Sequence, residues 1–267
     1  MIKLLQIEYM KVKNYGTFWA ILGIYAALVP LTYLGVAQFS GGGGLIPSES
    51  MLFSFPSIWH YYTWIASCWN MLLGVLVVIL VCNEYSFKTE RQSVINGLSR
   101  RDVIIGKFLF IVVLAAAIAI YTFIVAAIIG LIYSGPYNFG PKMYFVVIYF
   151  VQTIGYFVFA FLLAVLMKRP ALCIIIYVIV LTIDIFLYDD NLLSHHAQFV
   201  PTITIAELTP SPFYNTQMAM LKADAMQKGI PFEEPPNMDQ LTRSILASIY
   251  IAIMIFVGYF VVRRRDL

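Results

Sequence analysis

Residues 108–133, FLFIVVLAAAIAIYTFIVAAIIGLIY, form an apolar run without a single charged residue. A helix needs about 20 mostly apolar residues to cross the roughly 30 Å hydrocarbon core of a bilayer. This stretch is long enough and therefore predicts a membrane-spanning helix. Similar charge-poor runs recur on both sides of it, so the same prediction extends to most of the chain.

The composition agrees with a membrane protein. Of the 267 residues, 61% are hydrophobic and only 12% are charged, whereas soluble domains carry roughly a quarter charged residues. So few charges could not cover a globular surface, which excludes a soluble enzyme, and so much apolar surface excludes a disordered chain. The net charge of +3 is small and spread along the chain, so it gives no indication of nucleic-acid binding.

Charge-poor stretches of sufficient length predict an all-α integral membrane protein with six transmembrane helices in a single transmembrane domain. The expected spans are about 17–39, 59–82, 108–133, 143–167, 170–188 and 244–262. The fifth span is the shortest and carries Asp184 near its end. This aspartate is only about a turn from Tyr188 and the outer surface, so we interpret its position as interfacial.

The basic residues favour one orientation in the membrane. With six spans both termini lie on one side, and that side receives all but four of the 17 lysines and arginines. The exceptions are Lys142, Lys222, Lys228 and Arg243. Because lysine and arginine gather on the cytoplasmic side of membrane proteins, we expect both termini in the cytoplasm. The expected location is a plasma membrane, namely the inner membrane of a bacterium.

Residues 1–15 predict an amphipathic helix that lies in the cytoplasmic interface of the membrane. The apolar residues expected to share one stripe of this helix are Ile2, Leu5, Tyr9 and Val12. The charged residues expected off that stripe are Lys3, Glu8, Lys11 and Lys13. Such a helix can be an anchor or a lever that touches a cytoplasmic partner, and the sequence leaves both roles open.

Residues 83–107, NEYSFKTERQSVINGLSRRDVIIGK, form the longest and most charged inner loop. Residues 84–96 suit a short helix with Gly97 as its C-terminal stop. The apolar residues expected on one face of this helix are Phe87, Val94 and Ile95. Ser99 and Asp102 then match the start signal of a second helix, which continues into the third span. The loop is therefore predicted to project a charged knob into the cytoplasm.

Residues 189–242 form a long connection on the outer side and are predicted to make an ordered extracytoplasmic cap. A helix is indicated by Ser211 as its N-cap, Pro212 at its first position and Gly229 at its end.

The motifs of soluble catalytic sites do not occur. There is no G-x-x-x-x-G-K-[ST], H-E-x-x-H or G-x-S-x-G pattern. Glu233 and Glu234 fall in a proline-rich turn outside the predicted spans, and His195 and His196 lack the i, i+4 spacing of a metal site. We therefore expect no catalytic residue, metal or cofactor in this chain.

The inner loop resembles the cytoplasmic coupling region of type-2 ABC exporter permeases. Those proteins tend to show a glutamate and an aromatic residue at the end of the second span, then Lys/Arg-Thr, then Ser-Arg before a Gly-Lys. The matching residues are Glu84-Tyr85, Lys88-Thr89, Ser99-Arg100 and Gly106-Lys107. The six-span plan, the interfacial N-terminal helix and the helical outer connection are also similar. One departure is Asn96-Gly97-Leu98, where that family often has a proline.

The resemblance implies the membrane subunit of an ATP-driven exporter. Two permease subunits, identical or homologous, would enclose the pathway within the membrane lipid. A pair of cytoplasmic ATPase subunits would bind ATP and Mg²⁺ and would dock against residues 84–101. The implied coupling residues are Glu84, Tyr85, Phe87, Lys88, Thr89, Arg91, Val94, Ile95, Leu98, Ser99, Arg100 and Arg101.

Two other functional classes remain open on the sequence alone. One is a secondary transporter or channel without an ATPase, although such carriers usually need charged groups at the membrane midplane and the predicted spans have essentially none there. The other is a membrane scaffold without transport. The uncharged span walls, with a few polar residues such as Asn70, Gln152 and Thr153, favour an amphipathic substrate such as a lipid, drug or peptide. The same residues would also serve to pack the spans together.

Overall fold

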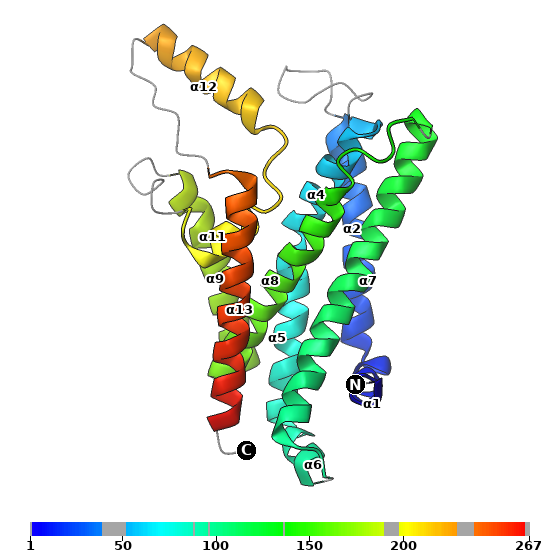
Figure 1. The fold of residues 1–267 in the computed structure, drawn as a ribbon, viewed down its shortest axis with the longest axis vertical. Helices are drawn as coiled ribbons and strands as arrows, with labels where there is room; N and C mark the ends of the chain where they lie inside the picture. Colours follow the sequence, from blue (N-terminus) through cyan, green and yellow to red (C-terminus); the bar gives the residue numbers. More distant parts are fainter. Residues whose placement is uncertain are drawn as a thin grey trace.

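The structure, a computed structural model, describes residues 2–38, 52–87, 89–95, 97–135, 137–189, 198–228 and 238–264. Within these ranges every regular element is a helix, which confirms the all-α prediction. Long helices lie side by side in an elongated bundle, and both chain termini lie at the same end of it (Figure 1). We call this end the base of the bundle.

The central helix of the bundle is α8. The helices in chain order are α1 (Ile2–Lys13), α2 (Gly16–Gln38), α4 (Ser57–Cys68), α5 (Asn70–Ser86), α6 (Thr89–Ile95), α7 (Arg100–Ser134), α8 (Tyr144–Met167), α9 (Pro170–Asp189), α11 (Pro201–Ala206), α12 (Tyr214–Lys228) and α13 (Gln240–Arg264). α8 contacts α4, α5, α7, α9, α11 and α13. Its large side chains Tyr149, Phe157 and Phe161 are accordingly fully buried.

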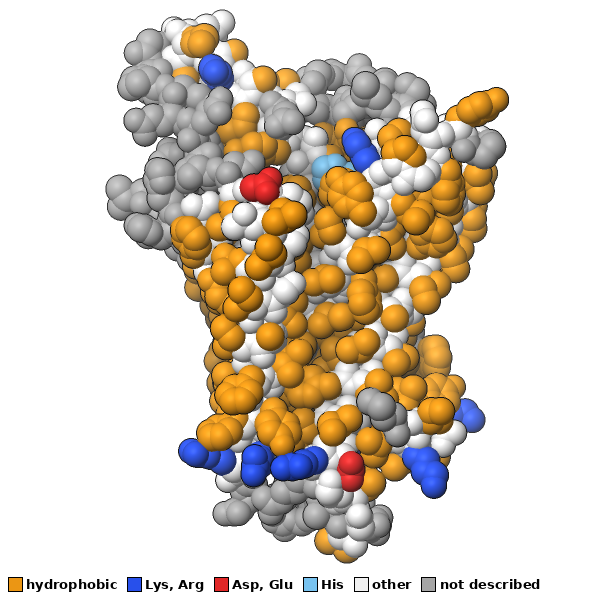
Figure 2. Space-filling view, viewed as in Figure 1, with side chains coloured by type: hydrophobic (Ala, Val, Ile, Leu, Met, Phe, Trp, Pro, Cys, Tyr) orange, Lys and Arg blue, Asp and Glu red, His pale blue; other side chains and the backbone are white. Residues whose placement is uncertain are grey.

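Four helices, α2, α7, α8 and α13, are long and apolar enough to cross a membrane. α4 and α5 together would provide a fifth span, although they are bent by 44° relative to each other. The apolar part of α9, Pro170–Asp184, is shorter. Figure 2 shows a broad hydrophobic surface along the bundle and a row of lysine and arginine side chains near the base. The described residues thus support a multi-pass membrane protein with four or five candidate spans.

The bend between α4 and α5 divides the helix within the span expected over residues 59–82. At the break, the N–H of Trp69 donates to the Ala66 carbonyl and the N–H of Leu72 donates to the Trp69 carbonyl. These tighter i to i+3 bonds interrupt the α-helical pattern. The indole N–H of Trp69 also donates to Thr32 Oγ1 of α2 at 3.2 Å. The break between α4 and α5 therefore coincides with a contact between helices. The local sequence predicts neither the break nor the contact.

The start of α12 differs from the prediction in the same way. α12 begins at Tyr214, two residues later than predicted, after a turn in which the Ser211 carbonyl accepts the Tyr214 N–H at 3.2 Å. Ser211 Oγ nevertheless accepts the Phe213 N–H at 3.3 Å, as expected of a capping residue. The Phe213 ring packs against Tyr61 and Trp64 of α4 with centroid distances of 5.5 Å. Packing on α4 thus holds this segment outside the helix. The predicted stop, Gly229, lies outside the described residues.

Polar side chains inside the bundle bond to one another. Tyr25 Oη lies 2.5 Å from Tyr149 Oη, and the Tyr149 hydroxyl donates to Asn70 Oδ1 at 3.0 Å. Asn70 Nδ2 in turn lies 3.4 Å from Thr153 Oγ1. Asn70, Gln152 and Thr153 are all fully buried. Buried polar groups in an apolar setting must be satisfied internally, so these residues pack the helices together in this structure.

Gly74 provides a test of the packing between α5 and α9. A methyl group at this position would overlap the ring of Tyr177 on α9, and that ring is itself fully buried. We expect Gly74→Ala to lower the free energy of unfolding by about 1–3 kcal/mol because the core becomes overpacked. Thermal unfolding in a mild detergent measures the effect.

Gly23→Ala in α2 is the matched control, since nothing lies within 4 Å of the added methyl group. It is expected to leave stability unchanged or to raise it by up to about 1 kcal/mol through helix propensity. Equal unfolding temperatures for the two variants would contradict the packing of α9 against α5.

Candidate functional site

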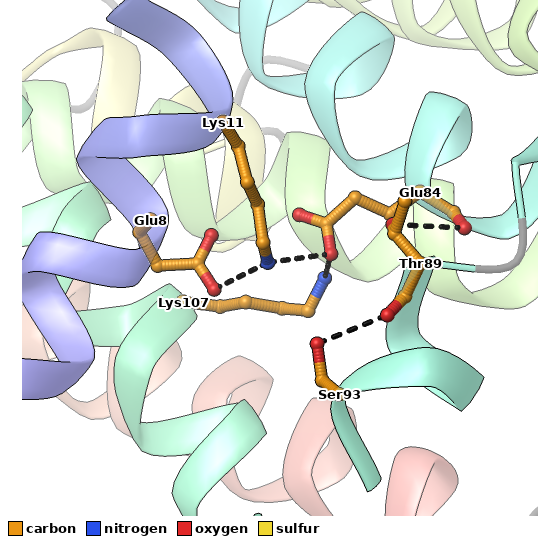
Figure 3. A network of polar contacts seen from close by, with 6 residues as sticks. All are labelled: Glu8, Lys11, Glu84, Thr89, Ser93 and Lys107. Carbon is orange, nitrogen blue, oxygen red and sulfur yellow. Dashed lines mark hydrogen bonds and ion pairs between the residues drawn. The ribbon is translucent and has the colours of Figure 1, made fainter. Parts of the chain in front are cut away.

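Four charged side chains from three helices meet at the base of the bundle. We call Glu8, Lys11, Glu84 and Lys107 the basal ion network (Figure 3). Lys107 Nζ lies 2.8 Å from Glu84 Oε2, and Lys11 Nζ lies 3.1 Å from the same oxygen. Lys11 Nζ also lies 2.7 Å from Glu8 Oε1. Glu84 of α5 therefore connects α1 with α7.

The network is buried and balanced in charge. The Lys107 side chain is 4% exposed and that of Glu84 is 13% exposed. Burial raises the pKa of Glu8 above its ordinary value, and the negative charge of Glu84 acts in the same direction, whereas Lys11 and Lys107 oppose it. Charges taken out of water are costly unless they are paired. Two lysines against two glutamates satisfy this requirement.

The network places Glu8, a charged residue of α1, against the protein. Ile2 and Tyr9, expected on the apolar stripe, are 76% and 48% exposed, whereas Glu8 is buried beside Val12. Lys11 holds Glu8 inward, and α1 packs directly on α7 at Gly106, where a methyl group would lie only 3.7 Å from Glu8 Cγ. The i, i+3 spacing of Glu8 and Lys11 was a signal for their pairing. Nothing local indicated that the pair faces the protein.

The predicted helix over residues 84–96 is divided into two parts. α5 ends at Ser86 and α6 begins at Thr89. Thr89 Oγ1 lies 3.4 Å from the Glu84 carbonyl oxygen and donates to it. Such a local bond between a side chain and the backbone competes with continuation of the helix.

The turn after α6 follows the prediction. Gly97 has a φ of +96°, a conformation that favours glycine, and the N–H of Leu98 donates to the Ser93 carbonyl at 3.2 Å. This bond is the 6→1 bond of a Schellman motif. The predicted glycine stop is confirmed, and Gly97 supplies the sharp turn between α6 and α7.

The start of α7 is also as predicted. The N–H of Asp102 donates to Ser99 Oγ at 3.1 Å, and the N–H of Ser99 donates to Asp102 Oδ2 at 3.3 Å. These two bonds form a capping box and leave Ser99 in an extended conformation. α7 then runs for 35 residues from this cap. The inner-loop turn is thereby attached directly to the longest helix of the described chain.

Several predicted coupling residues project from this region. Phe87 is 71% exposed and Ile95 is 76% exposed, and Arg101 is exposed at the first turn of α7. α6, which carries Ile95, lies at the base of the bundle (Figure 1), the end near which the row of basic side chains is seen (Figure 2). The inner loop thus exposes two large apolar side chains and one cation at the base of the bundle.

The remaining predicted coupling residues divide into two groups. Tyr85 is half-buried, with Lys168 Nζ 5.3 Å from its ring centroid, and Leu98 is also half-buried. The residues whose side chains lie outside the described set are Lys88, Arg91, Val94 and Arg100. A cavity of about 200 Å³ adjoins the basal ion network and is lined by Phe87, Thr89 and residues of α1, α5 and α7.

A comparison with protein families identifies the chain. The family model described as "ABC-2 family transporter protein" matches residues 4–184, more than half of the 267 residues. The chain belongs to this family. The match to the ABC-2 permease family includes α1, the basal ion network and α6. ABC-2 membrane subunits are generally non-catalytic and generally work with ATPase partners. A search of curated proteins finds no match to this ABC-2 permease.

Because the basal ion network is buried, removing one of its charges should lower the free energy of unfolding strongly. Lys107→Met should lower the free energy of unfolding by about 3–5 kcal/mol, because it leaves Glu84 buried with one partner fewer. Adding Glu84→Leu to that variant should recover part of the loss, since the uncompensated charge is then removed. Chemical or thermal unfolding in detergent measures both values.

The control is an ion pair of the same type on α12. Lys228 Nζ lies 2.6 Å from Asp224 Oδ2, but the two side chains are 61% and 55% exposed. Exposed pairs contribute about 0–1 kcal/mol, so Lys228→Met should change stability very little. A Lys107→Met variant as stable as Lys228→Met would contradict the structural importance of the network.

Proposed function

We propose that the chain is the membrane-spanning permease subunit of an ATP-driven exporter and that a separate cytoplasmic ATPase docks against residues 84–101. The observation that carries this proposal is the exposure of Phe87 and Ile95 at the basic end of the bundle. Exposed apolar side chains that are not part of a lipid-facing surface are typical of interaction sites. Family membership supports the kind of partner.

The docking surface has the composition of a protein interface. Phe87 and Ile95 supply apolar anchors, and Arg101 supplies a charged contact at the rim. The Schellman turn at Gly97 and the capping box at Ser99 hold the segment in one shape. A preformed docking segment loses little entropy on binding, which favours a stable complex.

The basal ion network is the proposed route from the ATPase to the spans. α6 is joined by short turns to α5 and α7, and the network adds α1 through buried ion pairs. Closure of an ATPase pair around ATP would move α6, and these connections would carry the motion into the bundle. Rigid-body movement of this kind is a recognised way to alternate access between two sides. The cavity beside the network leaves room for the displacement.

The finer topology is also part of the proposal. α9 contains 20 residues, a length that suits a sixth span, and α4 with α5 would form one bent span. The row of basic side chains near the base supports cytoplasmic termini under the positive-inside rule. Two such subunits, identical or homologous, would pair in a bacterial plasma membrane to enclose a path for an amphipathic lipid, drug or peptide.

Charge reversal tests the docking surface. The tagged permease is purified in mild detergent, the co-purified proteins are identified, and nucleotide hydrolysis is measured. We expect an ATPase with a P-loop to accompany the wild type. Arg100→Glu with Arg101→Glu should reduce its recovery and substrate-stimulated hydrolysis by about tenfold or more, because the rim contacts become repulsive.

The matched control reverses Arg263 and Arg264, a basic pair in the last turn of α13. It imposes the same charge change on a different helix and should leave the ATPase bound. If the permease is recovered alone, or if both reversals act equally, residues 84–101 are not the docking site. Recovery of the permease without an ATPase would favour a carrier or a scaffold.

A further inference from the structure

A second and larger cavity lies between α4, α5, α8, α9 and the segment that begins with α11. Its volume is about 390 Å³. The lining residues used below are Trp64, Ser67, Tyr156, Asp184, Glu207 and Thr209. We call it the α9–α11 cavity. Exposed Cys68 and Met71 also line it, so it opens to the surface of the bundle beside them.

Asp184 is the unusual member of this wall. Its side chain is only 8% exposed, and its Oδ2 atom has no hydrogen-bond partner among the described residues. Thr202 lies near the same carboxyl group, but Oδ2 itself is left without a donor among the described residues. Leaving a buried polar atom unpaired is costly, and leaving a buried charge unpaired is more so. A ligand in the adjoining cavity could supply the hydrogen-bond donor that Asp184 Oδ2 lacks.

Two hydroxyl groups of the wall, on Ser67 and Thr209, can also act only as acceptors. Ser67 Oγ donates its hydrogen to the Trp64 carbonyl at 2.7 Å, and Thr209 Oγ1 donates its hydrogen to Gln152 Oε1 at 2.8 Å. Because a hydroxyl has one hydrogen and two lone pairs, both oxygens can only accept from a ligand. The orientation of the Gln152 amide is supported by its Nε2, which donates to the Ala206 carbonyl at 2.7 Å.

The charge balance of the wall is negative. The lining residues that the structure describes include Asp184 and Glu207 but no lysine, arginine or histidine. Arg243 of α13 donates to the Glu207 backbone carbonyl at 3.1 Å and lies 3.3 Å from Glu207 Oε2. Glu207 therefore has a counter-ion within the protein. Among the described residues, no ion pair gives Asp184 a counter-ion.

We propose that the α9–α11 cavity binds the primary ammonium group of an amphipathic molecule, with Asp184 as its counter-ion. An ammonium group offers three donors, which matches the acceptors Asp184 Oδ2, Ser67 Oγ and Thr209 Oγ1. Trp64 and Tyr156 supply aromatic rings, which favour a cation near their faces. The apolar chain would leave past Met71 toward the surface of the bundle. The claim that such molecules are the transported substrates rests on the exporter function proposed above. The claim that the cavity binds them does not.

Equilibrium dialysis tests the site without any ATPase. The full chain is placed in lipid nanodiscs, labelled octylammonium is the probe, octanol is its uncharged counterpart, and uptake by empty nanodiscs is subtracted. We expect saturable binding of octylammonium. Asp184→Asn should weaken it by about tenfold or more, since a charge-assisted hydrogen bond is lost, while octanol uptake should not respond to this variant.

Asp224→Asn is the matched control, because Asp224 lies on α12 and is exposed and paired with Lys228. It should bind octylammonium like the wild type. Ala206→Phe is a second variant that fills the cavity without changing charge, and it should abolish binding. Unfolding temperatures establish that each variant is folded.

The proposal is overturned if octylammonium uptake equals that of empty nanodiscs, or if Asp184→Asn and Asp224→Asn bind it equally. It is also overturned if Asp184→Asn weakens octanol and octylammonium alike, because the site would then recognise the chain and not the ammonium group. None of these results depends on docking of an ATPase. Conversely, loss of the docking site would leave the binding measurement unchanged.

Discussion

The buried pairing of Glu84 with Lys107 and Lys11 is the constraint on which the base of the molecule depends. None of these charges is stable in a buried position alone, so the helices that carry them must stay together. α1, α5 and α7 are thereby held together at the base. α6 is joined to α5 and to α7 by short turns. The amphipathic N-terminal helix is consequently part of the protein core at Glu8 and Val12, and a membrane anchor alone would not require that.

The two polar regions away from the base differ in one respect. In the middle of the bundle, Tyr25, Tyr149, Asn70 and Thr153 bond to one another, so this group is complete and serves packing. In the α9–α11 cavity, Asp184 retains an unpaired oxygen beside open space. A satisfied buried network stabilises one structure, whereas an unsatisfied group next to a cavity is suited to a ligand. This contrast separates the packing residues from the proposed binding residues.

The sequence predicts features that depend on local chemistry. Gly97, Ser99 and Asp102 were predictable because a helix stop and a capping box need only residues close together in the chain. The bend at Trp69 and the delayed start of α12 were not, since each accompanies packing against another helix. The apolar runs likewise predict an all-helical membrane protein. They do not reveal which charges are buried, because the pairing of Glu84 with Lys107 requires α5 and α7 to be placed together.

Site-specific photo-cross-linking tests the central claim most directly. A benzophenone amino acid replaces Ile95 on α6 in cells that produce the protein with its natural partners, and the captured proteins are identified. Tyr137 is the control position, since it is 82% exposed in the turn that follows α7. We expect capture of a P-loop ATPase from position 95 and not from position 137. Capture of no ATPase from position 95, or equal capture from both positions, would contradict it.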